Sequence, residues 1–358
     1  MDLSKVNLTE RMKNSPLIKE RIKGMNFGFL SKRGYYATDE AKRQPAIMRE
    51  FGVNCVTLNL NVCQEKYSST KIFLDFDYSV GEDELVEMAQ LFHAEGISVI
   101  LKPCMTCLDG QPMCSVDFPA VGTQIEGIRE DYRAKWFISY EQCVLFAAAL
   151  AEKMRAEALM IGAELLGMEG GWGNEVDGYW TRIIEKSREV YSGLLTYEFT
   201  FASRRRHELK WFKDLDFLSY SYYPPACPAD HLFDPENNPT YTLDEIREFL
   251  SLREQKINEI CARFDNKPIL FTEYGVRSAH GCIQRPYNFE WRTRYDGEEQ
   301  ANFMKASFEV FDKVPYWMGL LWWKWDETQN RPHYHDEEGK DKGFTIQGKP
   351  AEKIFREA

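Results

Sequence analysis

The sequence contains no apolar run of about 18 residues, the length that a membrane-spanning helix requires. Its first segment, Met1 to Lys23, is polar and charged and has no apolar stretch like the centre of a secretory signal. We therefore expect no membrane partner and a cytoplasmic location. Secretion of the protein with later removal of its signal remains an open alternative.

Basic segments are also scarce. The chain of 358 residues has a formal net charge of −11, and Arg204–Arg206 is its clearest basic run. Nucleic acids and anionic membranes bind to basic patches, so neither is expected as a partner. We interpret Arg204–Arg206 as the start of a solvated helix. The composition does not determine the oligomeric state.

The cysteines do not form a disulfide or metal-binding pattern. There are nine, an odd number scattered through expected strands and helices, which indicates free thiols. Cys104, Cys107 and Cys114 lie close together in sequence but have no fourth ligand at a suitable spacing. We interpret His333–Asp336 as a loop over the mouth of a cleft. The sequence therefore predicts neither a metal site nor a cofactor.

Two short apolar segments end in a glutamate. One runs from Leu159 to Glu164 and the other from Pro268 to Glu273. A continuous apolar run is typical of a parallel strand that is covered on both faces, and the glutamate would then lie at the edge of the core. Two carboxyl groups that face one cleft are what glycoside hydrolysis requires, one as an acid and one as a nucleophile or base.

The rest of the chain alternates strand and helix patterns, and eight such units predict a single (β/α)8 TIM barrel of the α/β class with long loops at its C-terminal face. We expect residues 1–23 to form a polar extension and residues 24–358 to form the barrel. The expected strands are Met25–Leu30, Val53–Leu60, Ile97–Pro103, Ala158–Ala163, Gly193–Thr200, Asp216–Tyr222, Pro268–Thr272 and Met318–Lys324. The expected helices are Glu82–Ala94, Trp136–Met154, Asp177–Val190, Leu243–Phe264 and Gln300–Lys313.

Active sites of such barrels lie where the strands end. The residues at the expected strand ends combine carboxyl, amide, hydroxyl, ammonium and aromatic groups, a mixture that suits an oligosaccharide. Alternation along the last strand would place Trp323 and Trp325 on one face, which we predict to be the cleft face. The predicted substrate-binding residues are Asn61, Lys102, Tyr197, Thr200, Trp323 and Trp325.

Several motifs, taken in order, resemble glycoside hydrolase family 113. They are Asp75-Phe76, Ser79–Glu84, Val99–Pro103, Trp136–Tyr140, Ile161–Glu164, Tyr191–Tyr197, Tyr222–Pro224 and Phe271–Gly275. The resemblance extends from about Gly24 to Trp325. It implies a TIM barrel that hydrolyses β-mannan or β-manno-oligosaccharides by double displacement, with retention of the anomeric configuration.

The resemblance also implies roles for individual residues. Glu164 would be the general acid/base after the fourth strand, and Glu273 the nucleophile after the seventh. Tyr222 would donate a hydrogen bond to Glu273 and keep it ionised and oriented. The two carboxyl groups would then lie roughly 5 Å apart, as in retaining enzymes, rather than at the wider inverting separation.

Four positions depart from the family pattern. Leu30 replaces a tryptophan, Cys104 a histidine, Ala163 an asparagine, and Thr200 an amide-bearing residue. Each change removes a polar or stacking group from the expected sugar sites and leaves both carboxylates in place. We therefore expect the chemistry to be kept and the specificity to be altered.

The sequence leaves alternatives open. The same two carboxylates would serve an exo-mannosidase, a transglycosylase or a hydrolase of another β-hexoside. Long loops at residues 106–131, 225–241 and 279–297 would favour an exo or short-oligosaccharide enzyme if they closed one end of the cleft. A carbohydrate-binding barrel without catalysis is the alternative from another class.

Overall fold

Eight parallel strands form a closed barrel in the computed structural model, in the order β1 to β8 around the ring. The structure describes residues 1–2, 4–29, 31–118, 130–170, 176–200, 202–203, 209–228, 234, 237–325 and 340–358. The strands are β1 Ile22–Phe27, β2 Cys55–Gln64, β3 Ser98–Cys107, β4 Ala158–Ala163, β5 Leu194–Thr200, β6 Leu218–Ser221, β7 Ile269–Tyr274 and β8 Trp317–Trp325. The predicted TIM barrel is confirmed.

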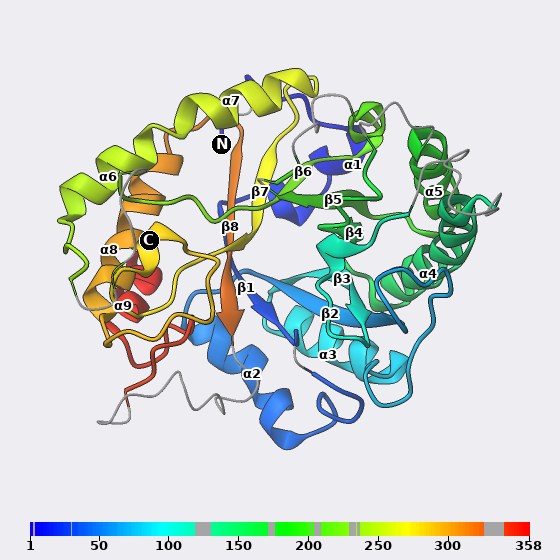
Figure 1. Cartoon of the computed structure of the whole chain (residues 1–358), viewed down its shortest axis with the longest axis horizontal. Helices are drawn as coiled ribbons and strands as arrows, with labels where there is room; N and C mark the ends of the chain where they lie inside the picture. Colours follow the sequence, from blue (N-terminus) through cyan, green and yellow to red (C-terminus); the bar gives the residue numbers. More distant parts are fainter. Residues whose placement is uncertain are drawn as a thin grey trace.

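Helices surround the barrel in the order of the chain (Figure 1). The α-helices that follow the strands are α2 Asp39–Glu50, α3 Glu82–Ala94, α4 Tyr132–Met154, α5 Val176–Val190, α6 Leu243–Ser251, α7 Glu254–Arg263, α8 Gly297–Phe311 and α9 Pro350–Glu357. Short 3-10 turns lie at η1 Pro16–Ile18, η2 Met113–Ser115, η4 Lys210–Asp214 and η5 Cys282–Gln284.

Each strand of the barrel has an inner and an outer face. On β5, Leu194 belongs to a small apolar cluster inside the barrel, whereas Leu195, Tyr197 and Phe199 belong to the larger cluster in which the strands pack against the helices. Successive side chains of a strand point to opposite faces. Position along a strand therefore decides whether a residue near its end can reach a site above the barrel.

The N-terminal segment packs against the barrel. The short helix α1, Glu10–Lys13, is capped by Thr9, whose hydroxyl accepts a hydrogen bond from the backbone of Met12. Met12 and Leu17 are buried in the same inner cluster as Ile22. The segment before β1 therefore covers one end of the barrel. The predicted boundary at residue 23 falls inside β1.

Helix boundaries differ from the predictions where local signals are weak. Helix α2 is not among the predicted helices, and it contains Pro45, a residue that normally ends a helix. The predicted helix Leu243–Phe264 is two helices, α6 and α7, separated at Leu252 and Arg253. Neither difference changes the strand ends on which the site is built.

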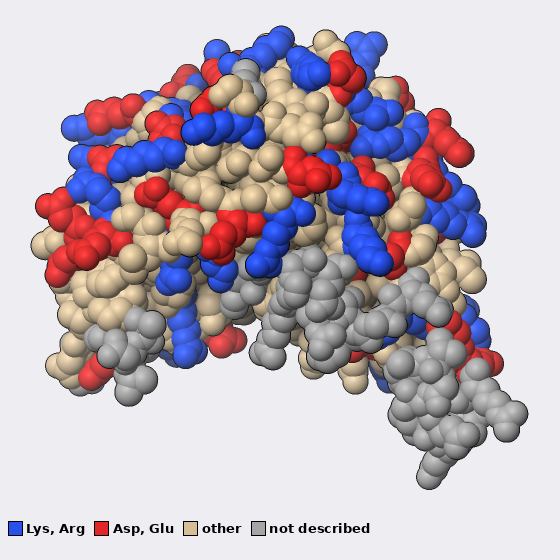
Figure 2. Space-filling view, turned by 90° about the horizontal axis from the view of Figure 1, so that it is seen from above, with Lys and Arg blue, Asp and Glu red and all other residues tan. Residues whose placement is uncertain are grey.

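No helix in the described ranges is long and apolar enough to span a membrane. Acidic and basic side chains are interspersed on the face drawn in Figure 2, over the residues coloured there. This mixed surface agrees with the composition, which supplies no excess of basic groups.

Candidate active site

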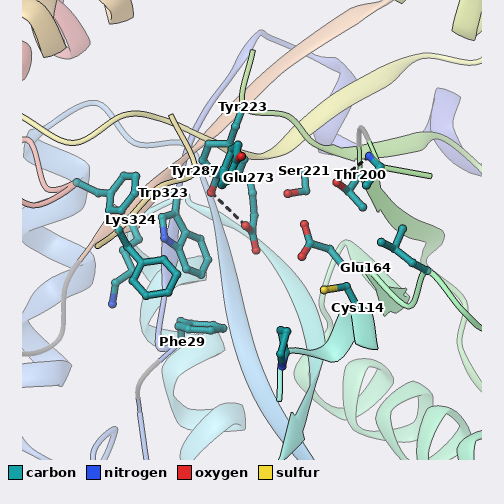
Figure 3. A pocket seen from close by; sticks show the side chains of 15 residues that line it. Phe29, Cys114, Glu164, Thr200, Ser221, Tyr223, Glu273, Tyr287, Trp323 and Lys324 are labelled. Atoms are coloured by element: carbon teal, nitrogen blue, oxygen red, sulfur yellow. Dashed lines mark hydrogen bonds between the residues drawn. The ribbon is translucent and has the colours of Figure 1, made fainter. Parts of the chain in front are cut away.

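A cavity of about 550 Å³ lies at the C-terminal ends of the strands (Figure 3). Its lining combines two acidic groups, hydroxyl groups and a set of aromatic rings. The lining residues are Phe29, Pro112, Cys114, Glu164, Leu166, Thr200, Ala202, Ser221, Tyr223, Glu273, Tyr287, Phe289, Trp323, Lys324 and Phe344. In TIM barrels this end of the strands carries the active site.

Glu164 and Glu273 point toward one another across this cavity (Figure 3). Glu164 directly follows β4, and Glu273 lies on β7. A carboxylate oxygen of Glu164, one of Glu273 and one of a third residue, Glu198, all lie within 4.8 Å of each other. In inverting enzymes the two carboxyl groups lie at least roughly 6.5 Å apart. Glu164 and Glu273 are closer than this, which suits direct attack by one carboxylate.

Glu164 has a raised pKa. Its backbone adopts a left-handed conformation with φ of 51°, which is uncommon for a residue other than glycine, and its N–H donates to the carbonyl of Glu198 at 2.9 Å. Burial, followed by the charge of Glu273, raises the pKa of Glu164 to about 7, although a hydrogen bond with Ser221 and the charge of Lys102 oppose this rise. The carboxyl group can therefore carry a proton near neutral pH.

Glu273 is held by two donors. The phenol of Tyr223 donates to its Oε2 at 3.1 Å, and Nζ of Lys102 contacts its Oε1. The prediction that Tyr222 makes the first contact is wrong by one residue. Tyr222 faces outward, where its ring stacks on Tyr220 at 4.5 Å. Strand alternation explains the difference, since Ser221 and Tyr223 share the cavity face.

Lys102 forms an ion pair below Glu273. Its ammonium group is completely buried and lies 2.7 Å from Oε1 of Glu198, which is also completely buried. The predicted contact of Lys102 with substrate is therefore wrong, because its donors are directed to Glu198 and Glu273. Glu198 was missed, although a charged residue in the centre of the apolar strand Leu194–Thr200 is a signal that could have found it.

Only one of the two predicted tryptophans faces the cavity. Trp323 lines it and packs edge-on against Phe29, with ring centroids 4.8 Å apart. Trp325 is buried against Phe51 and donates to Oε1 of Gln44, so its prediction is wrong. Strand β8 shifts register against β1 at this point, and such a bulge breaks the simple alternation on which the prediction depended.

Of the other predicted substrate-binding residues, one lines the cavity and two do not. Thr200 lines the cavity. Tyr197 lies on the outer face of the same strand, where its hydroxyl donates to Glu169 at 2.9 Å and accepts from the backbone of Leu165. Asn61 donates to backbone carbonyls of two loops and does not line the cavity. The predictions for Tyr197 and Asn61 are therefore wrong, and both residues support loops.

The departures from the family pattern occupy different places. The thiol of Cys104 is buried and donates to Oδ1 of Asn59 at 3.0 Å, and burial raises its pKa to about 12. Ala163 is buried in β4 and is not part of the cavity wall. Thr200 is part of that wall. Leu30 lies outside the described residues.

Two groups of side chains in the described parts of the chain are close enough to share a metal ion. In the first, Glu164, Glu198 and Glu273, the ammonium group of Lys102 already provides a cation for two of the three carboxylates. In the second, His280 contacts Asp296 through Nδ1 and the carbonyl of Asn238 through Nε2, both at 2.9 Å. Neither group includes Cys104, Cys107 or Cys114, and His333–Asp336 and Arg204–Arg206 lie outside the described residues.

A sequence profile of glycoside hydrolase family 113 matches residues 25–349. The chain belongs to this family. The resemblance seen in its motifs is confirmed, and the protein is a glycoside hydrolase.

Solved structures of the family agree with this assignment over nearly the whole chain. A β-mannanase of family 113 from Alicyclobacillus acidocaldarius, in complex with the ligand ManMIm, matches with a TM-score of 0.77 and 26% identity over 96% of this chain and 98% of that one. A β-1,4-mannanase of the family matches with a TM-score of 0.76 and 26% identity over 94% and 98% of the two chains.

A curated relative from another group matches over a shorter segment. A β-glucuronidase from Streptococcus agalactiae serotype V is 26% identical over 95 residues, which is 26% of this chain and 15% of that protein. The present chain thus spans a small part of the length of this relative.

Proposed function

We propose that this protein hydrolyses β-mannan or β-manno-oligosaccharides by double displacement, with retention of the anomeric configuration. The observation that carries the proposal is the pair of carboxyl groups, Glu164 and Glu273, which face one another across the aromatic-lined cavity with oxygens within 4.8 Å. The β-mannanases that share its family and fold support mannose as the sugar.

In the first step, Glu273 attacks the anomeric carbon and Glu164 gives its proton to the glycosidic oxygen. A bond forms between C1 and the carboxylate oxygen, the bond from C1 to the leaving oxygen breaks, and a glycosyl-enzyme results. Tyr223 and Lys102 hold the carboxylate of Glu273 in place for this attack.

In the second step, Glu164 takes a proton from water, which attacks C1 and releases Glu273. The charge of Glu273 is one cause of the raised pKa of Glu164. Because the glycosylated Glu273 is neutral, the pKa of Glu164 falls once the intermediate has formed, and Glu164 becomes a base.

Product analysis tests this proposal. Purified protein is incubated with β-1,4-mannohexaose and with mannan, and NMR follows the anomeric configuration of the first product. We expect cleavage with a β-configured first product. An α-configured first product would contradict double displacement. Cleavage of β-glucan or β-galactan in preference to mannan would show that the substrate is another β-hexoside.

The lengths of the products separate endo from exo action. Two of the long loops contribute to the cavity wall, with Pro112 and Cys114 from the loop after β3 and Tyr287 and Phe289 from the loop after β7. These contacts favour an enzyme that prefers short oligosaccharides. Such an enzyme should cut mannotetraose faster than mannan and release mannose or mannobiose from one end.

A pair of tyrosine variants tests how Glu273 is oriented. Tyr223→Phe removes the donor to Glu273, and we expect kcat to fall by roughly 10- to 100-fold, because a hydrogen bond to a charged group contributes about 1.5–3 kcal/mol. Tyr222→Phe is the matched control, since its hydroxyl belongs to the adjacent, outward-facing ring, and should keep kcat within about twofold. Steady-state kinetics on mannohexaose measures both, and equal losses would contradict the assignment to Tyr223.

A further inference from the structure

A third carboxylate lies beneath the two that face the cavity. Glu198 is on β5, and its side chain is completely buried. One of its oxygens lies within 4.8 Å of an oxygen of both Glu164 and Glu273. It does not line the cavity and therefore cannot contact a sugar directly. Any effect of Glu198 on the reaction must pass through another side chain.

That side chain is Lys102. Its ammonium group bonds to Oε1 of Glu198 at 2.7 Å and also to Oε1 of Glu273. The three groups form a row in which one buried cation is shared by two carboxylates. Burying an ammonium group is strongly unfavourable unless a charged partner compensates it. Lys102 therefore requires at least one carboxylate at every stage of the reaction.

Double displacement removes one of these carboxylates. When Glu273 forms its bond to C1 it becomes a neutral ester, and the negative charge that faced Lys102 is lost. Glu164 is ionised at that stage, but it bonds to Ser221, whereas the ammonium group of Lys102 bonds to Glu198 and Glu273. Glu198 remains in contact with the ammonium group throughout.

The geometry points to Glu198 as a positioning residue that serves as the counter-ion of Lys102 while Glu273 is covalently occupied by sugar. This inference rests on the proposed double displacement. It assigns to Glu198 a role in the stability of the glycosyl-enzyme, separate from the roles of Glu164 and Glu273.

The groups around Glu198 fit this role. Glu198 faces Lys102 and Cys104 on β3 and Glu273 on β7. It also faces Glu164 at the end of β4 and Tyr223 just after β6. Burial raises the pKa of the Cys104 thiol to about 12 and that of the Tyr223 phenol well above its usual value, so both are neutral near pH 7. The local charge balance is therefore set by Lys102 and the three carboxylates.

The ionisation of Glu198 responds to the state of Glu273. Burial raises the pKa of Glu198 to about 8, Lys102 opposes the rise, and the charges of Glu273 and Glu164 add to it. Formation of the ester removes the contribution of Glu273 and leaves that of Lys102. The pKa of Glu198 then falls, which favours its ionised form as the partner of Lys102.

The second oxygen of Glu198 indicates that the residue does more than complete a static ion pair. Its Oε2 is buried and has no hydrogen-bond partner among the described residues. A buried polar atom without a partner is costly, so its presence beside the two facing carboxylates calls for an explanation. A static ion pair would be more stable with both oxygens satisfied.

The test measures the formation and the breakdown of the glycosyl-enzyme separately. The probe is 2-deoxy-2-fluoro-β-mannosyl fluoride, which reacts with the nucleophile and whose fluorine slows both steps, so that labelling and reactivation can be followed by mass spectrometry. Labelling of the wild-type protein at Glu273 must be seen first. Its absence would count against the proposed function itself and not only against the role of Glu198.

With wild-type labelling established, Glu198→Gln should slow labelling by roughly tenfold or more and leave reactivation unchanged or faster, because the unpaired Lys102 destabilises the ester and stabilises the departing carboxylate. Glu198→Asp keeps the charge and should recover part of the labelling rate. The double variant Lys102→Met with Glu198→Gln removes both charges and should label faster than Glu198→Gln alone.

Glu299→Gln is the matched control. Glu299 on α8 is also buried, and burial raises its pKa to about 8, but it bonds to the backbone of Gly281 and lies outside the cavity wall. This variant should keep both rates. Equal slowing of labelling and reactivation by Glu198→Gln, or no change in either, would overturn the inference and leave Glu198 a structural partner of Lys102.

Discussion

Glu273→Gln should lower kcat on manno-oligosaccharides by roughly 10⁴-fold or more, because the amide cannot form the covalent bond to C1. The amide has the same shape as the carboxyl group and keeps an acceptor for the phenol of Tyr223. Lys102 keeps Glu198 as its partner. The loss should therefore come from the chemistry rather than from unfolding.

Steady-state kinetics and thermal unfolding, measured together, check this expectation. Glu259→Gln, an exposed glutamate on α7, is the control and should keep full activity. The variant at Glu273 should also bind mannohexaose with an affinity near that of the wild type. Hydrolysis within about tenfold of the wild-type rate would show that another group is the nucleophile. If the wild-type protein did not hydrolyse the sugar, and if Glu273→Gln bound it as tightly as the wild type, the carbohydrate-binding barrel would be favoured.

The sequence was sufficient to predict the barrel and its two facing glutamates. Apolar runs that end in a charged residue are local signals, and the predicted strand Ala158–Ala163 coincides with β4. Seven further strands overlap the predictions with shifts of a few residues. Strand ends are defined by hydrogen bonds to neighbours, which a single sequence does not show.

The errors at the site arise from the direction of side chains. Tyr222 and Tyr197 point outward from the barrel. Simple alternation from Thr200 would have placed Tyr197 there, and alternation from Ser221 would have placed Tyr222 there. Trp325 could not have been placed in this way, because the register shift between β8 and β1 depends on contacts between strands far apart in sequence. Bulges of this kind are set by tertiary packing.

The residues that the sequence did not reveal belong mainly to loops and to the barrel interior. Tyr287 and Phe289 reach the cavity from a loop whose path is fixed by tertiary contacts, such as the hydrogen bond between His280 and Asp296. Glu198 reaches Lys102 because β3 and β5 lie on either side of β4 in the closed barrel, where the two buried side chains meet. Closure of the barrel brings together groups that no local pattern connects.

The loss of activity in Glu164→Gln should depend on the leaving group of the substrate. For manno-oligosaccharides, whose leaving oxygen needs a proton, we expect kcat/KM to fall by roughly 10²–10⁴-fold, the usual contribution of general acid catalysis. For a dinitrophenyl β-mannoside, whose leaving group departs without a proton, the first step should be nearly unchanged. The second step still needs a base, so the dinitrophenolate should appear as a burst followed by slow turnover.

The pH dependence gives the same variant an independent test. Burial and the charge of Glu273 raise the pKa of Glu164 to about 7, and the first step needs its protonated form. Wild-type kcat/KM on manno-oligosaccharides should therefore be full below this pKa and fall as the pH rises through about 7. In Glu164→Gln this alkaline fall should be absent, because no proton remains to be lost. If the fall persisted in the variant, a group other than Glu164 would be the titrating acid.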